Sequence, residues 1–373
     1  MYFHELAHSS LATAASQVRP ECTGILVQGT GSGSGPNVVH AANMDQSPEE
    51  VRALTLHVRF INSSSMNATS SDDDDGFLFQ GVDWYWFTTG LTRAVKGNLA
   101  SLQENWRSSE TPLDVSAVFD DIKAGVVPQV FVFRATLLST DATIVGSFNQ
   151  LLNHLATVRI AAPFYIVVAG VALGEGAVLT RNETGVVGPP GGCGSIAVGH
   201  SESDSADDDN EASPYWWNGC EVPRLAADGS VSFVVQTNYD WWLADPPSDP
   251  RRLAATSMLQ QLSCAQAGST SPTSHVGNSS SSSGRSASST VGLSGNDCRG
   301  DLGLMDAFAV ASAYPVHNPH TAYTAMMRAA GKTTDDSMSS SKAGSLLAYV
   351  RVAMCPENTV SAPYSDPRYC ARI

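Results

Sequence analysis

The chain has 373 residues, which is enough to bury a sizeable core and leaves the number of domains open. Its 36 acidic residues outnumber its 21 Lys and Arg, giving a formal net charge of −15, and the basic residues form no patch along the sequence. This balance argues against nucleic acid as a partner. No apolar run reaches the roughly 18 residues that span a bilayer, which argues against a membrane-spanning helix.

Strand patterns dominate the first part of the chain. Residues 22–27 and 38–44 are rich in β-type side chains and flank a glycine-rich hairpin. Residues 54–60 alternate apolar and polar positions with a period of two, and 77–79 continue this pattern after a polar loop. The aromatic run at 84–87 is predicted to pack in a core.

The pattern then changes to helix and back to strand. Apolar residues recur at helical spacing over 141–156 behind the cap candidate Asp141, which predicts an amphipathic helix. Strands are predicted at 164–169, 177–180 and 231–237, and the last of them leads into Asn238. This order favours an α+β layered sheet over a doubly wound one.

Two segments are predicted to be inserts with little to bury: 194–219 is acidic, and 265–297 consists mainly of Ser, Gly and Thr. Six of the seven cysteines fall into sequential pairs that close off these inserts and the C-terminal tail, although other connectivities stay open. The predicted disulfides join Cys193 to Cys220, Cys264 to Cys298, and Cys355 to Cys370. Cys22 is left over, and an unpaired cysteine in a paired set is a candidate nucleophile.

The disulfides and the glycosylation sequons at Asn62, Asn67 and Asn182 indicate the secretory route. The first twenty residues lack the apolar core of a signal peptide. We therefore expect the true N-terminal part of the protein to lie upstream of Met1.

Several ordered motifs resemble one family. Residues 235–242 (VQTNYDWW), 249–252 (DPRR) and 175–181 (EGAVLTR) resemble the TNYDxW, DDRR and EGxVITR segments of acid ceramidase and N-acylethanolamine acid amidase. Residues 315–318 (PVHN) and 321–324 (TAYT) resemble the PVxN and TxYTT pair of the same proteins. These belong to the N-terminal-nucleophile hydrolases related to choloylglycine hydrolase.

The resemblance implies a fold and a division of the chain. The fold is an αββα sandwich, in which two mainly antiparallel sheets lie between helix layers. Residues 1–21 would be the remnant of a propeptide or α-subunit, and 22–373 a catalytic, β-subunit-like amidohydrolase domain that carries both inserts.

The resemblance also implies a catalytic set. Cys22 would attack the Glu21 carbonyl to cut the chain, so that thiol and free α-amine share one residue, and would later attack the substrate amide. Asp45 would hold the α-amine, Asn238 would donate N–H groups to the tetrahedral oxyanion, and Arg251 would fix neighbouring polar groups.

One departure bears on this set, because the family has an arginine three positions before the aspartate and this chain has Ala42 there. Arg107 is a candidate to compensate for it. Asn43, Asn105 and Tyr239 are further secondary candidates. His40 is predicted to be a strand residue that faces a neighbour rather than a catalytic base.

These features predict a lipid amide hydrolase that cleaves ceramide to fatty acid and sphingoid base through a thioester on Cys22. An N-acylethanolamine acid amidase with the same mechanism is the alternative, and a non-enzymatic or impaired scaffold is another, since Ala42 replaces the arginine and the prosegment is short. No metal and no organic cofactor are predicted. The expected partners are the lipid amide, the protein's own propeptide or α-subunit, and a membrane surface or lipid carrier. The expected location is a lysosome or another acidic secretory compartment, with secretion also possible.

Overall fold

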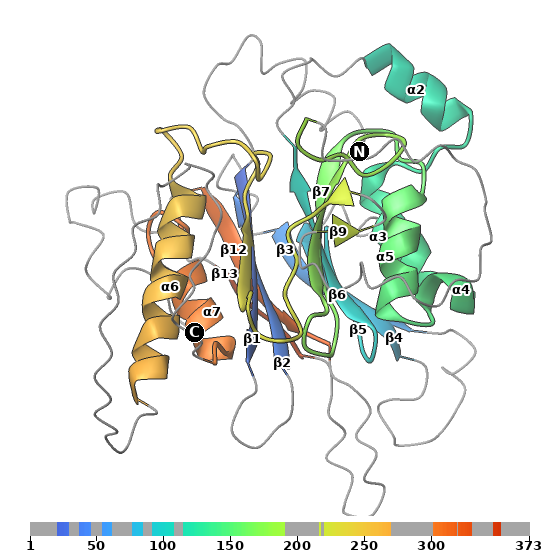
Figure 1. Cartoon of the computed structure of the whole chain (residues 1–373). Coiled ribbons are helices and arrows are strands. Elements are labelled where there is room, and N and C mark those ends of the chain that lie inside the picture. Colours follow the sequence, from blue (N-terminus) through green and yellow to red (C-terminus); the bar gives the residue numbers. More distant parts are fainter. Residues whose placement is uncertain are drawn as a thin grey trace, which may run out of the picture.

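The computed structural model describes residues 21–29, 37–45, 54–61, 77–84, 92–107, 115–190, 216–217, 220–269, 301–318, 320–329 and 346–351. Two antiparallel sheets lie face to face, with helices on the outer face of each, so the chain forms four layers (Figure 1). Within the described ranges, none of the helices is long and apolar enough to cross a membrane.

The first sheet carries the predicted nucleophile strand near its centre. Its strand order is β11-β1-β2-β12-β13, and every neighbouring pair is antiparallel. The strands are β1 (Glu21–Gly29), β2 (Asn37–Asp45), β11 (Phe233–Gln236), β12 (Thr321–Arg328) and β13 (Leu346–Arg351).

The second sheet is an antiparallel meander in chain order, β3 to β8. Its strands are β3 (Thr55–Ile61), β4 (Phe77–Trp84), β5 (Arg93–Lys96), β6 (Ala100–Trp106), β7 (Phe164–Ala169) and β8 (Gly176–Arg181). A separate two-stranded ribbon joins β9 (Trp216–Trp217) and β10 (Cys220–Glu221).

The helices cover the outer faces of the sheets (Figure 1). Helices α6 (Arg251–Ser269) and α7 (Leu304–Ala311) pack Leu259 and Val310 against Ile25 and Val39 of the first sheet. Helices α3 (Gln129–Leu138) and α5 (Phe148–Thr157) cover the second sheet. The two remaining helices are α2 (Val115–Lys123) and α4 (Ala142–Val145).

Because each sheet is covered on both faces, its central strands are buried along most of their length rather than at alternate positions. All six residues of β7 are buried, for example. Between the sheets, Leu26 and Val38 of the first sheet pack against Tyr165, Val167 and Val178 of the second. The predicted α+β class and the layered arrangement of two antiparallel sheets are confirmed.

The predicted strands are confirmed with shifted ends, and the strand expected at 231–237 is shorter, at Phe233–Gln236. The single helix predicted over 141–156 is wrong, because the structure has α4 and α5 with a break at Gly146 and Ser147. Ser147 starts a new helix there, since its Oγ accepts a hydrogen bond from Gln150 N at 3.2 Å.

The insert predicted from residue 265 begins too early, because α6 continues to Ser269. Apart from 216–217, the insert 194–219 lies outside the described residues, as do residues 85–87 of the aromatic run.

Candidate active site

Cys22 is the second residue of β1 and lies in the layer between the two sheets. Its side chain is 3% exposed, and its Sγ lies 3.6 Å from Met44 Sδ on the neighbouring strand β2. It is the free cysteine among the described ones, as predicted. The structure describes the uncut chain, in which Glu21 and Cys22 belong to the same strand and Glu21 pairs with Asp45.

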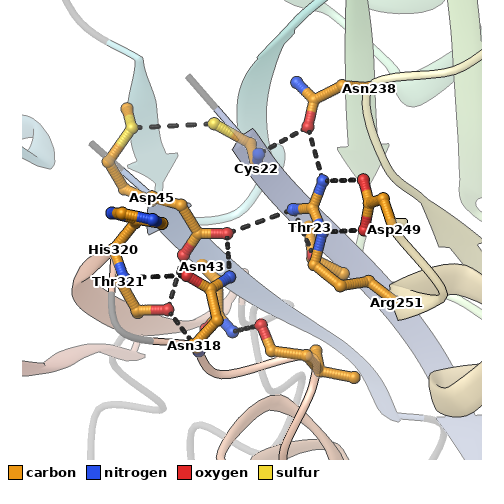
Figure 2. A network of polar contacts seen from close by, with 12 residues as sticks. Cys22, Thr23, Asn43, Asp45, Asn238, Asp249, Arg251, Asn318, His320 and Thr321 are labelled. Atoms are coloured by element: carbon orange, nitrogen blue, oxygen red, sulfur yellow. Dashed lines mark hydrogen bonds and ion pairs between the residues drawn. The ribbon is translucent and has the colours of Figure 1, made fainter. Parts of the chain in front are cut away.

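Asn238 holds the backbone nitrogen of Cys22. It lies in the loop after β11, and its Oδ1 accepts a hydrogen bond from Cys22 N at 2.6 Å (Figure 2). Its Nδ2 donates to Trp106 O at 2.8 Å, which ties the loop to the end of β6 in the other sheet. The nitrogen that chain cleavage would turn into an α-amine therefore already has a fixed acceptor.

Arg251, the first residue of α6, links the side chains around Cys22 and is 2% exposed. Its Nη2 donates to Asn238 Oδ1 and its Nη1 to Asp45 Oδ2, both at 3.1 Å (Figure 2). Asp249 accepts from Arg251 Nε and Nη2, each at 2.7 Å. This bidentate pair fixes the plane of the guanidinium, so its remaining donors point at the site.

Asp45 ends β2 and is fully buried. Besides Arg251, it accepts from Asn318 Nδ2 at 2.9 Å and from Thr321 Oγ1 at 2.5 Å. Burial raises the pKa of the Asp45 carboxyl above its ordinary value, while Arg251, Thr321, Asn318 and Arg93 act in the opposite direction.

Burial has the largest effect on the pKa of the Cys22 thiol. Burial raises the pKa of Cys22 above its ordinary value, and the nearby Asp45 and Glu104 carboxyls raise it further. Arg93 of β5 lowers it, through its charge and through a hydrogen bond. In the uncut chain the thiol is therefore held in its neutral form, with one buried cation acting against this.

The four predicted catalytic residues are thus brought together, although their roles stay predictions. Asn238 binds Cys22 N through its oxygen, and Asp45 contacts Arg251, Asn318 and Thr321.

The secondary candidates hold the surroundings of the site. Arg107 donates to both carboxylate oxygens of Asp240, from Nε at 2.7 Å and from Nη2 at 2.8 Å, and Tyr165 Oη donates to Asp240 Oδ1 at 2.8 Å. The carbonyl of Tyr239 accepts from Gln236 Nε2 at 2.9 Å. These contacts fix the loop that carries Asn238.

Asn43 and Asn105 also connect layers. Asn43 Nδ2 donates to the carbonyls of Ala311 and Val316, at the end of α7 and beyond it, so this side chain points away from Cys22 (Figure 2). Asn105 Nδ2 donates to Gln236 O at 3.2 Å and thereby joins β6 to β11.

His40 is a strand residue that contacts neighbours, as predicted, and it is fully buried. Its Nε2 donates to Gln103 Oε1 at 2.8 Å, and its Nδ1 accepts from Ser101 Oγ at 3.1 Å. Burial and the charge of Arg93 lower the pKa of His40 to about 3, while the Gln103 hydrogen bond acts the other way. The imidazole is therefore neutral and joins the two sheets.

Four further site residues were not predicted: Asp249, Asn318, Thr321 and Arg93. The first three lie inside segments that resemble family motifs, so those motifs could have identified them. Arg93 lies in no such segment.

Several other predictions fall partly outside the described residues. Cys220 and Cys264 are disulfide-bonded, but their predicted partners, Cys193 and Cys298, lie outside the described ranges, as do Cys355 and Cys370. The pairing stays a prediction. Asn62 and Asn67 also lie outside. Asn182 is half-buried in the turn after β8, where its Oδ1 accepts from the backbone of Thr184 and Gly185.

In the part of the chain that the structure describes, no group of three or more His, Cys, Asp or Glu side chains could hold a metal ion.

The chain is similar in sequence to several known proteins. No family model matches it. It is 22% identical to an N-acylethanolamine-hydrolyzing acid amidase of Caenorhabditis elegans over 65% of this chain, and 25% identical to one of Cavia porcellus over 87% of this chain. The chain spans only 52% and 66% of these relatives, respectively.

A solved structure of a Caenorhabditis elegans N-acylethanolamine-hydrolyzing acid amidase ortholog superposes with a TM-score of 0.51 at 20% identity. The match covers 82% of this chain and 92% of that one, so the two share a fold. In sequence and in fold, the chain is therefore similar to proteins of the acid ceramidase and N-acylethanolamine acid amidase family, as its motifs predicted.

Proposed function

We propose that this protein is an amidohydrolase that cleaves the N-acyl amide of a lipid with Cys22 as nucleophile. The observation that carries the proposal is the network around Cys22: its backbone nitrogen is bound by Asn238, which Arg251 links to Asp45. A buried thiol whose adjacent nitrogen has a preformed acceptor suits a nucleophile and base that share one residue.

The first step would be cutting of the chain. Cys22 Sγ attacks the carbonyl carbon of Glu21, the Glu21–Cys22 amide bond breaks, and the released nitrogen takes the proton that the thiol loses. Water then hydrolyses the resulting thioester, which leaves a carboxylate on Glu21 and a free α-amine and thiol on Cys22. The hydrogen bond from Cys22 N to Asn238 would keep the new amine in place.

Turnover would repeat the same chemistry on a substrate. The α-amine takes the thiol proton as Sγ attacks the substrate carbonyl, and it passes that proton to the leaving amine as the amide bond breaks. Water hydrolyses the acyl thioester and releases the fatty acid. An α-amine has an ordinary pKa of about 7.7–8.0, and burial beside Arg251 would lower it, which favours the neutral base at acidic pH.

The choice of substrate depends on the relatives. The motifs led us to expect ceramide, whereas the matched relatives are named N-acylethanolamine-hydrolyzing acid amidases. We therefore place an N-acylethanolamine first and ceramide second. An acidic secretory compartment remains part of the proposal.

The test starts from the full 373-residue chain, incubated at about pH 4.5 and about pH 7.5. We expect mass spectrometry to find a new N-terminus at Cys22, and fatty acid to be released from a fluorescent N-acylethanolamine. Cys22→Ala should abolish both, whereas Lys123→Ala, on the exposed face of α2, should change neither.

Far-UV circular dichroism checks that both variants fold. An intact, folded wild-type chain that hydrolyses neither lipid would refute the proposal and favour the non-catalytic scaffold. Faster release from ceramide than from the ethanolamide would reverse the order of substrates only.

A further inference from the structure

Arg93 reaches the nucleophile from the opposite sheet. It begins β5, in the interior of the second sheet, and is fully buried. Side chains two positions apart in a strand point to the same face, so Arg93 points to the same side as Val95. Val95 packs in one cluster with Cys22 and Ala42. Arg93 therefore enters the layer between the sheets on the side of the thiol.

Contacts to two strands of the first sheet hold this guanidinium. Arg93 Nη2 donates to the carbonyl oxygen of Asn43 on β2 at 3.1 Å, and its Cζ lies 5.9 Å from the ring centroid of Tyr323 on β12. Asn43 directly precedes Met44, whose Sδ contacts Cys22 Sγ. The cation is thus fixed against the two strands that form this side of the site.

Position 42, which lies in the cluster around the thiol, carries no charge. The resemblance described above leads us to expect an arginine three positions before the aspartate, and this chain has Ala42 there, fully buried in the same cluster as Cys22. We propose that Arg93 takes the place of that arginine and supplies, from the facing sheet, the positive charge that stabilises the Cys22 thiolate. This inference rests on the proposed role of Cys22.

Arg93 opposes the other effects on the pKa of the Cys22 thiol. Burial raises the pKa of Cys22, and the carboxyls of Asp45 on β2 and Glu104 on β6 act in the same direction, whereas Arg93 opposes all three. His40, which also faces this layer, is neutral. Arginine stays protonated even when buried, and charges interact strongly where water is excluded. Arg93 is a positioning and electrostatic residue in this scheme, because it acts through Cys22.

The test measures the thiolate without requiring turnover. The intact chain is treated at about pH 8 with a small alkylating reagent, and modification of the Cys22 peptide is followed by mass spectrometry. Since the thiolate is the reacting form, we expect Arg93→Met to slow labelling at least tenfold and Arg93→Lys to stay within about threefold of wild type.

Arg181→Met is the matched control, because Arg181 is equally buried but donates to the carbonyls of Leu155 and Val158 at the end of α5. It should leave the labelling rate unchanged.

Three outcomes would overturn the inference. The first is a folded Arg93→Met chain that labels at the wild-type rate, and the second is a wild-type chain in which Cys22 is not labelled. The third is a folded Arg93→Lys chain that labels as slowly as Arg93→Met, because packing rather than charge would then explain the effect.

If Arg93→Met does not fold, Arg93→Lys decides alone, and a tenfold loss there contradicts the inference. Arg93-dependent labelling in a chain that hydrolyses no lipid would refute the proposed function and leave this inference intact.

Discussion

The buried His40 makes a prediction about stability in acid. Its pKa is lowered from 6.5 to about 3 in the fold, whereas an unfolded chain titrates at the ordinary value. A group with a lowered pKa contributes stability above its unfolded pKa, and this is lost as the pH falls toward its folded pKa. The contribution should therefore be present above pH 6.5 and decline progressively below it.

The size of this loss of stability follows from the same two pKa values of His40. At about pH 4.5 the unfolded chain has bound the proton and the fold has not, which favours unfolding by about 100-fold, or about 2.7 kcal/mol. Urea denaturation followed by tryptophan fluorescence, at about pH 7.5 and about pH 4.5, gives the loss for wild type. His40→Gln cannot titrate and keeps an N–H that can donate to Gln103. We expect it to lose roughly 2–3 kcal/mol less than wild type between the two pH values.

Other ionisable groups titrate over this range in both proteins, so the comparison depends only on the difference between them. His40→Gln is expected to be less stable than wild type at about pH 7.5, since one of the two sheet-to-sheet hydrogen bonds is lost. An identical pH dependence of wild type and variant would show that position 40 is not held neutral, and the reasoning from burial would fail.

Three further changes have expected outcomes. Gly24→Ala places a Cβ 2.8 Å from Gln103 Oε1, which is already engaged in the sheet-to-sheet network, and should cost about 1–3 kcal/mol in urea denaturation. Tyr165→Phe removes the hydroxyl that donates to Asp240 at 2.8 Å and should lower the unfolding free energy by about 1 kcal/mol. Arg251→Lys replaces the planar fork by a single ammonium and should slow appearance of the new N-terminus at least tenfold, measured by mass spectrometry.

Each of these has its own control. Gly185→Ala adds a Cβ with no atom within 4 Å and should leave the urea midpoint unchanged, so an equal loss in both glycine variants would contradict the clash. A Tyr165→Phe chain as stable as wild type would show that Asp240 is held by Arg107 alone. Chain cutting at the normal rate in Arg251→Lys would mean that positive charge, rather than the fixed geometry, is what the site requires.

Much of the fold could be predicted because its strands carry strong local patterns. The runs at 22–27, 38–44 and 164–169 are mostly apolar and buried throughout, since both faces of each sheet are covered. Helix α6 has no such signal: glutamines, serines and small residues interrupt its apolar stripe. The break before Ser147 is equally hard to predict, because apolar spacing continues through it while hydrogen bonding does not.

Local sequence patterns predict only part of the site. Asn238 and Arg251 could be picked out from their motifs, Cys22 as the cysteine left over, and Asp45 from the family resemblance, but no pattern says that β12 lies beside β2. That pairing brings Thr321 to Asp45, 276 positions earlier in the chain. The position of Arg93 depends on how the two facing sheets are placed against each other. A four-residue strand that begins with Arg93 and ends with Lys96 does not predict this placement.

The position of Cys22 near the beginning of β1 also bears on what cutting would do to the sheet. From Gly24 onward, β1 has strand neighbours on both sides, β11 and β2, whereas Glu21 and Cys22 are paired with β2 alone. A break in the backbone between these two residues would therefore fall ahead of the doubly flanked part of the strand. The new terminus would stay anchored by the intact ladder that follows it, and the nucleophile would keep its place in the sheet after the chain is cut.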